Sequence, residues 1–203
     1  MTLPTLPYYD ITYHGKAIIE TLRGSSGPAK RLYYDAPLVG AEIGVWRGKN
    51  AATLLSRLPG LRLYMVDMWG EGTPVLGRDP IQGDAQMAEA LAETSFAEDR
   101  RVVVRCASPA AVALIPEPLD FVFVDGDHYF DGCLADLRAW WPLVKPGGWM
   151  MGHDIDNPST VAETAKFWGV RQAVEQFCSE AGGLTFTVSP YPAMVFAIRK
   201  EGA

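Results

Sequence analysis

Carboxylates and imidazoles follow two apolar runs of this sequence, where they could act together. Asp125 ends the run LDFVFVD, and Asp127 and His128 come directly after it. His153 and Asp154 follow a second run, WMMG. Side chains of these types can transfer protons as general acids and bases, or they can bind a divalent metal ion that activates an oxygen. If the two runs are neighbouring strands, both groups face one crevice.

The surrounding sequence alternates short β-type runs with longer helical stretches, which is the pattern of a parallel sheet covered on both faces. The last two strands are joined by a turn too short for a parallel crossover, so that pair must be antiparallel. We therefore predict an α/β, Rossmann-like fold: a seven-stranded, mostly parallel sheet with one antiparallel strand and helices on both faces. The predicted strands are Leu38–Val45, Leu61–Asp67, Arg101–Cys106, Leu119–Asp125, Trp149–Gly152, Leu184–Ser189 and Ala193–Arg199.

Helical spacing of apolar residues occurs between most of these strands. The stretch from Lys145 to Gly148 is interpreted as a helix stop and turn, and the Gly- and Pro-rich stretch from Trp69 to Gln82 as a lid or binding loop. The predicted helices are His14–Arg23, Lys49–Leu58, Asp84–Glu98, Phe130–Val144 and Thr160–Ala181.

A glycine turn, EIGVWRG, follows the first predicted strand. In a dinucleotide-binding turn, a second glycine two residues after the first lets the backbone touch the pyrophosphate. Trp46 stands at that position, and its bulk would block the approach, which disfavours NAD. Asp67, at the end of the second strand, can accept hydrogen bonds from ribose hydroxyls. After the third strand, Ala107 and Ser108 could border an adenine. Each signal alone is also typical of an ordinary turn or helix cap, but their joint order favours a nucleoside cofactor.

The segments AEIGVWRGKNA, YMVDMW, CAS, FVFVDGDHYFDG and LVKPGGWMMGHD resemble the class I methyltransferases, whose cofactor is S-adenosylmethionine. More narrowly, they resemble the small-molecule O-methyltransferases of the macrocin and cephalosporin-biosynthesis type, with catechol O-methyltransferase more distant. The resemblance extends from about Leu38 to Asp154. It implies that the cofactor's methionine end lies near the glycine turn and Asn50, its ribose at Asp67 and its adenine near Ser108. The predicted cofactor-binding residues are Glu42, Gly44, Gly48, Asn50, Asp67, Met68, Ala107, Ser108 and Asp125.

Two mechanisms fit methyl transfer to a hydroxyl. In the first, Asp125, His153 and Asp154 hold a divalent metal ion, Mg²⁺ or Mn²⁺, which lowers the pKa of the hydroxyl. The resembling families often carry an acidic or amide residue where this chain has His153, and imidazole suits Mn²⁺, Fe²⁺ or Zn²⁺ better than Mg²⁺. In the second, His128 is the general base, with Asp127 or Asp125 fixing its tautomer; His153 is a further candidate base. The routes can act together, and we favour metal assistance. The predicted catalytic residues are His128, Asp125 and His153.

The predicted function is O-methylation of a sugar, polyketide or phenolic hydroxyl. The alternatives left open are an N-methyltransferase that needs no metal, a dinucleotide oxidoreductase or other Rossmann-like nucleotide-binding protein, and a non-catalytic protein that keeps the fold. All of the candidate catalytic side chains are present, which disfavours the last of these.

Composition excludes several other classes. The formal net charge is -6 with no run of Lys or Arg, so nucleic acid is not an expected partner. No stretch approaches the ~20 apolar residues of a membrane span, and the first residues lack a signal-peptide pattern. Three cysteines without metal-ligand spacing indicate a reduced, cytoplasmic protein.

The chain is expected to divide into a tyrosine-rich N-terminal segment, residues 1–37, and a methyltransferase domain, residues 38–203. The first segment is interpreted as a cover over the active site or a dimer contact. A homodimer is expected.

Overall fold

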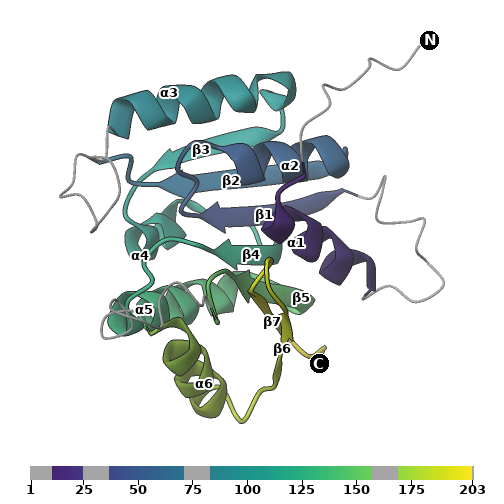
Figure 1. The fold of residues 1–203 in the computed structure, drawn as a ribbon, viewed down its shortest axis with the longest axis vertical. Coiled ribbons are helices and arrows are strands. Elements are labelled where there is room, and N and C mark those ends of the chain that lie inside the picture. The colour runs from purple at the N-terminus through teal and green to yellow at the C-terminus, as the bar shows by residue number, and fades with distance from the viewer. Residues whose placement is uncertain (1–10, 25–36, 71–82, 157–168, 203) are drawn as a thin grey trace.

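A single sheet organises the part of the chain that the computed structural model describes, namely residues 11–24, 37–70, 83–156 and 169–202. Its strand order is β3-β2-β1-β4-β5-β7-β6 (Figure 1). All pairs from β3 to β5 are parallel, whereas β7 is antiparallel to both β5 and β6. The predicted mostly parallel sheet with one reversed strand is confirmed. The strands are β1 Leu38–Ile43, β2 Leu61–Asp67, β3 Arg101–Arg105, β4 Leu119–Val124, β5 Val144–Gly152, β6 Phe186–Ser189 and β7 Val195–Arg199.

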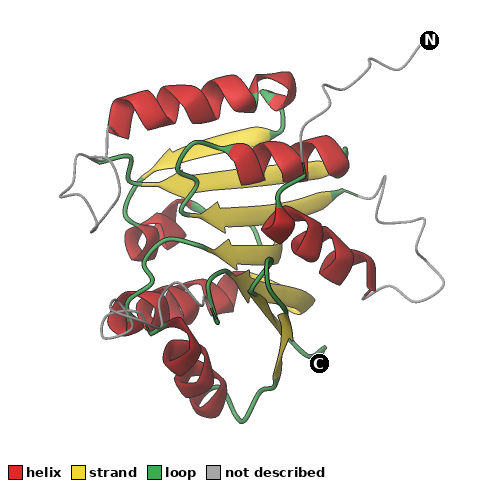
Figure 2. Ribbon diagram, in the orientation of Figure 1, coloured by secondary structure: helices red, strands yellow, loops and turns green. Residues whose placement is uncertain are grey.

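Helices lie on both faces of this sheet (Figure 2). Alternate residues of β4 show the two faces: Phe121 and Phe123 pack with α1, α2 and α3, whereas Val122 and Val124 pack with α4, α5 and α6. Both faces of the central strands are therefore buried, which explains their continuous apolar runs. The helices are α1 Tyr13–Gly24, α2 Lys49–Arg57, α3 Gly83–Glu93, α4 Ser108–Ala111, α5 Phe130–Trp140 and α6 Val170–Glu180, with 3₁₀ turns η2 Ser95–Ala97, η3 Val112–Leu114 and η4 Trp141–Leu143.

The strand order reverses at the centre of the sheet. From β1 the chain runs through α2 to β2 on one side, while β4 pairs with the other side of β1. The carboxyl ends of β1, β2 and β4 point to the same edge (Figure 2). In open sheets of this kind, a ligand crevice forms at that edge where the order reverses. The residues after β1 and β4 therefore meet at the expected binding edge.

Two element boundaries differ from the prediction near β5. The sequence predicts a turn from Lys145 to Gly148, but β5 already begins at Val144. Backbone bonds hold it there: Gly147 N donates to Lys200 O over 2.6 Å, and Lys200 N donates to Gly148 O over 2.9 Å. The register with β4 shifts in this region, and Gly147 takes a φ of 81°, so the turn residues form an irregular start of the strand.

The predicted helix Phe130–Val144 also ends early. α5 stops at Trp140 and a 3₁₀ turn follows, because Pro142 has no backbone N–H to continue the helix. Likewise, α3 ends at Glu93, before the η2 turn, rather than at Glu98.

Two predicted features lie partly outside the described residues. Most of the loop predicted between Trp69 and Gln82 and the first part of the predicted helix Thr160–Ala181 lie outside the described residues. Among the helices that the structure describes, none is long and apolar enough to cross a membrane.

Candidate active site

The turns after β4 and β5 meet at the carboxyl edge of the sheet. The β4–β5 ladder pairs Val124 with Gly152, and His153 N continues it by donating to Val124 O over 3.1 Å. On the other side, Asp125 N donates to Ile43 O of β1 over 2.7 Å. Main-chain hydrogen bonds thus place Asp125 between the ends of β1 and β5.

Glycine is required for this close approach at the end of β1. Gly44 has a φ of 85°, and a Cβ atom there would lie 2.2 Å from the carbonyl oxygen of Asp125. A side chain at this position would push the two strand ends apart. The prediction that Gly44 shapes the site is thus given a structural reason, which is contact with Asp125.

Four side chains converge on one point beyond these strand ends. His128 Nε2 lies 3.0 Å from Asp154 Oδ2 and 3.3 Å from Asp125 Oδ1. His153 Nδ1 lies 3.4 Å from one oxygen of each carboxylate. One ligand atom from each of the four residues lies within 4.8 Å of the other three. The structure therefore brings together the predicted catalytic residues and the predicted metal ligands, which we call the His–Asp cluster: Asp125, His128, His153 and Asp154.

The His–Asp cluster is a network of opposite charges. Burial alone would raise the pKa of Asp125, but hydrogen bonds with His128 and His153 lower it to about 2. Burial alone would lower the pKa of His128, but its bonds to Asp125 and Asp154 raise it to about 9. The pKa of His153 is raised for the same reason, against the effect of burial. The carboxylate of Asp125 is thus held ionised, as metal binding requires.

Asp154 adopts an uncommon backbone conformation in this cluster. Its φ is 60°, in the left-handed region that Asp tolerates better than most residues. Its side chain is only 5% exposed. The turn after β5 therefore aims a buried carboxylate at the other three residues.

Asp127 does not contact His128, contrary to one of the two predicted alternatives for fixing its tautomer. Asp127 Oδ1 accepts a hydrogen bond from Tyr129 N over 2.8 Å, at the start of α5. Asp125 is the residue that contacts the imidazole. Asp127 instead stabilises the turn into the helix.

A third histidine, His14, lies beside the His–Asp cluster. Its ring centroid is 4.8 Å from that of His153, and it stacks on Phe123 at 6.2 Å with an interplanar angle of 17°. Burial lowers the pKa of His14, and the charge of Asp125 only partly opposes this effect. Sequence analysis missed this residue, since nothing local to α1 indicates where the helix docks.

Glu42 and Asn50 form a buried pair next to the glycine turn. Asn50 Nδ2 donates to Glu42 Oε1 over 3.0 Å, and Asn50 Oδ1 accepts from Thr12 Oγ1 over 3.0 Å. Glu42 is 1% exposed, and its Oε2 has no hydrogen-bond partner. Burial raises the pKa of Glu42 to about 8. This end of the crevice therefore holds a buried oxygen that is free to meet a ligand.

Asp67 holds two turns together. Its Oδ2 accepts from the backbone N–H groups of Val45 and Trp46, each over 2.9 Å, and its Oδ1 accepts from Trp69 N over 2.8 Å. Asp67 therefore fixes the glycine turn, and the predicted ribose contact would be an additional role. Met68, the next residue, is 62% exposed at the same edge.

Ser108 is engaged by α5. Its hydroxyl donates to Asp136 Oδ1 over 2.6 Å and accepts from Trp140 Nε1 over 2.9 Å. Burial raises the pKa of Asp136 to about 6. Ala107, beside it, is exposed. The hydroxyl predicted to border the adenine is thus bound within the protein, which leaves the backbone of Ala107 and Ser108 for that contact.

Gly48 is placed by packing rather than by the crevice. With a φ of 79°, it lies against α3, where a Cβ atom would be 2.7 Å from Ala90 Cα. This close packing explains why position 48 needs a glycine, and its role at the methionine end stays a prediction.

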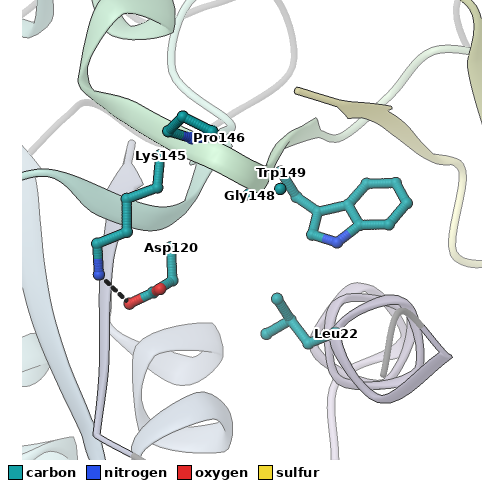
Figure 3. Close-up of a pocket in the computed structure, with 7 residues that line it drawn as sticks. Leu22, Asp120, Lys145, Pro146, Gly148 and Trp149 are labelled. Carbon is teal, nitrogen blue, oxygen red and sulfur yellow. Dashed lines mark hydrogen bonds and ion pairs between the residues drawn. The ribbon is translucent and has the colours of Figure 1, made fainter. Parts of the chain in front are cut away.

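A hollow of about 150 Å³ lies away from this edge, between the start of β5 and the end of α1 (Figure 3). Within it Lys145 Nζ is paired with Asp120 Oδ2 over 2.9 Å, and Asp120 Oδ2 also accepts from Val39 N. Leu22, Trp149 and residues 146–148 complete its lining. The charged groups of the hollow are thus satisfied within the protein.

Comparisons with known proteins agree on one family. The model described as a methyltransferase domain matches residues 41–155. No curated protein matches the chain. A putative caffeoyl-CoA O-methyltransferase from Staphylococcus aureus superposes with a TM-score of 0.63 at 15% identity, covering 97% of this chain and 86% of that one.

Two further structures are similar. An O-methyltransferase from Bacillus cereus, solved with SAH, has a TM-score of 0.61 at 18% identity and covers 96% of this chain and 84% of its own. A TDP-rhamnose 3′-O-methyltransferase of calicheamicin biosynthesis has a TM-score of 0.59 at 19% identity. The match covers 93% of this chain and 81% of that enzyme. At these identities the structures share the fold with this chain.

Proposed function

We propose that this chain, which belongs to the class I S-adenosylmethionine-dependent methyltransferases, transfers the methyl group to a hydroxyl of a small molecule. The observation that carries the proposal is the His–Asp cluster, in which four groups that can activate an oxygen lie within 4.8 Å of one another. A sugar, polyketide or phenolic hydroxyl is the acceptor class. The O-methyltransferases that share the fold support this choice.

The residues present fit the cofactor. Glu42 offers a buried oxygen, Oε2, that has no hydrogen-bond partner. Asn50 Nδ2 uses one of its two hydrogens in the bond to Glu42, so the second can donate to a ligand. Met68 is exposed at the same edge. Glu42 and Asn50 would hold the methionine end, Asp67 the ribose, and the turn at Ser108 the adenine. When bound, S-adenosylmethionine would supply a sulfonium methyl group that an acceptor oxygen can attack in line, with S-adenosylhomocysteine as the leaving group.

The donor set of the His–Asp cluster also fits a divalent metal ion. Asp125, His153 and Asp154 would hold it, because their oxygen and nitrogen atoms already converge on one point. When bound, such an ion lowers the pKa of the acceptor hydroxyl. The carboxylates contact the imidazoles and orient them, and the side chain of Asp154 is only 5% exposed, which limits its access to water.

His128 supplies a second route for the proton. Its Nε2 faces the two carboxylates at 3.0 and 3.3 Å, so Asp125 and Asp154 orient its ring. His128 can accept the hydroxyl proton only as a neutral imidazole, and the paired carboxylates favour its charged form. Metal assistance is therefore the favoured route, with His128 as base the alternative.

Calorimetric titration with S-adenosylhomocysteine tests the cofactor assignment. Met68→Ala should weaken binding without loss of stability, since this side chain is 62% exposed. Leu114→Ala, which truncates a side chain that is 59% exposed in η3, is the matched control and should bind like the wild type. No binding by the wild type would overturn the methyl-transfer proposal.

Turnover with acceptor panels tests the oxygen assignment. We expect the wild type to release S-adenosylhomocysteine when a sugar or phenolic hydroxyl is offered. This activity should be lost in the presence of a chelator and in the Asp154→Ala variant. Activity that is confined to amines and survives the chelator would instead establish metal-free N-methylation.

A further inference from the structure

All three histidines of the chain meet at one point of the fold. His14 comes from α1, His128 from the turn after β4 and His153 from the turn after β5. His14 is separated from each of the other two histidines by more than a hundred residues of sequence. Only the docking of α1 therefore brings its ring to the others. No other histidine is available elsewhere in the chain.

The atoms that face the centre of the His–Asp cluster are two nitrogens and two oxygens. His128 Nε2 and His153 Nδ1 both approach Asp125 Oδ1, at 3.3 and 3.4 Å, and each also approaches an oxygen of Asp154. Mg²⁺ prefers six oxygen ligands, several of them water, in near-octahedral geometry. Imidazole ligands bind Fe²⁺, Co²⁺ and Zn²⁺ more tightly than Mn²⁺. They bind Mg²⁺ more weakly than any of these transition-metal ions.

We propose that this cluster is a site for a transition-metal ion, with His128 and His153 as nitrogen ligands beside Asp125 and Asp154, and with His14 as a positioning residue for His153. This inference rests on the metal-assisted function proposed above. It adds His128 to the ligand set, selects the class of metal and assigns a role to α1.

His14 acts through its ring. Its contacts in the described part of the chain are the stack on Phe123 and the tilted contact with His153, and no hydrogen bond or ion pair of its imidazole is found there. His153 therefore contacts the His14 ring with its own ring and the two carboxylates with its Nδ1. A ligand fixed in this way keeps its Nδ1 aimed at the cluster.

The first turn of α1 is itself held rigidly. Thr12 Oγ1 accepts from Gly15 N over 3.1 Å and donates to Asn50 Oδ1 over 3.0 Å. Gly15 packs so closely that a Cβ atom would lie 2.6 to 2.8 Å from atoms of Thr12, Thr53 and Asn50. The position of His14 is therefore set by contact of α1 with α2.

The test measures metal binding directly, on the full chain stripped of metal by a chelator. Calorimetry with CoCl₂, MnCl₂ and MgCl₂ gives the affinities, and the visible absorption of bound Co²⁺ reports its ligands. We expect Co²⁺ and Mn²⁺ to bind more tightly than Mg²⁺. His153→Asp, which replaces an imidazole by a carboxylate, should lower the ratio of Co²⁺ to Mg²⁺ affinity and change the Co²⁺ spectrum, and His128→Asp should do the same.

Variants at His14 separate positioning from ligation. His14→Ala should lower Co²⁺ affinity by about 10- to 100-fold, the range for partners that orient a ligand. His14→Phe keeps a ring against His153 and should restore most of that affinity. Lys16→Ala, on an exposed position of the same helix, is the control and should bind like the wild type. Circular dichroism checks that each variant is folded.

Each contrary result has a distinct meaning. Equal or tighter binding of Mg²⁺ by the wild type overturns the metal class, and unchanged Co²⁺ affinity in His14→Ala overturns the positioning role. If no metal binds while S-adenosylhomocysteine still does, the present inference falls and methyl transfer stands. If neither binds, the proposed function falls as well.

Discussion

The ionisation of Glu42 should make the stability of this protein fall as the pH rises. Its carboxyl lies at the end of β1, is 1% exposed and has a single partner, Asn50. Burial raises its pKa from 4.5 to about 8; the Asn50 hydrogen bond opposes the rise, and the charges of Asp125 and Asp67 add to it. The folded protein therefore holds a proton that the unfolded chain releases near pH 4.5.

The sign follows from proton linkage. Between pH 4.5 and pH 8 the unfolded state binds fewer protons than the folded state, so the free energy of unfolding decreases with pH. The contribution is fully present below about pH 4.5 and is lost as the pH rises through about 8. The difference between the two pKa values corresponds to at most about 5 kcal/mol.

Urea unfolding of the wild type and of Glu42→Gln at pH 5 to 9, with a chelator present, measures this contribution. The amide mimics the protonated carboxyl, so the two proteins should have similar stability at pH 5. At pH 9 the variant should be the more stable by several kcal/mol, within the limit of about 5. Glu20→Gln removes an exposed carboxyl of α1 and should leave the slope unchanged. Parallel pH profiles for the wild type and Glu42→Gln would refute the reasoning.

Two other substitutions should destabilise the fold by different means. Gly44→Ala forces a Cβ atom to within 2.2 Å of Asp125 O at a φ of 85°, and should lower the free energy of unfolding by about 2–5 kcal/mol in urea; an unchanged midpoint would contradict this contact. Ser108→Ala leaves Asp136 and the Trp140 N–H without their partner, and should cost about 1–3 kcal/mol, measured by the same assay. A stability equal to that of the wild type would mean that water replaces the hydroxyl.

Much of the fold could be predicted from local patterns. Strands buried on both faces leave continuous apolar runs such as LDFVFV, and glycine turns mark their ends, so the order of elements was predicted correctly. The boundaries were wrong where pairing competes with local propensity. At Lys145 to Gly148 the bonds to Lys200 extend a strand through residues that favour a turn.

The meeting of Asp125, His128, His153 and Asp154 could also be predicted, because neighbouring parallel strands present their carboxyl ends at one edge. The family resemblance added the cofactor. Neither argument reaches the bond partners of each group. Asp67 faces three backbone N–H groups, a contact that depends on how two loops approach each other.

The amino-acid sequence alone therefore predicts the mostly parallel sheet and the set of side chains at its edge, since these follow from periodicity and chain direction. The contact of His14 in α1 with His153, and the hydrogen bond of Ser108 to Asp136 in α5, emerge only from the folded arrangement. Both depend on helix docking, in which many weak apolar contacts between distant segments select one arrangement, and no short pattern in the chain encodes that sum.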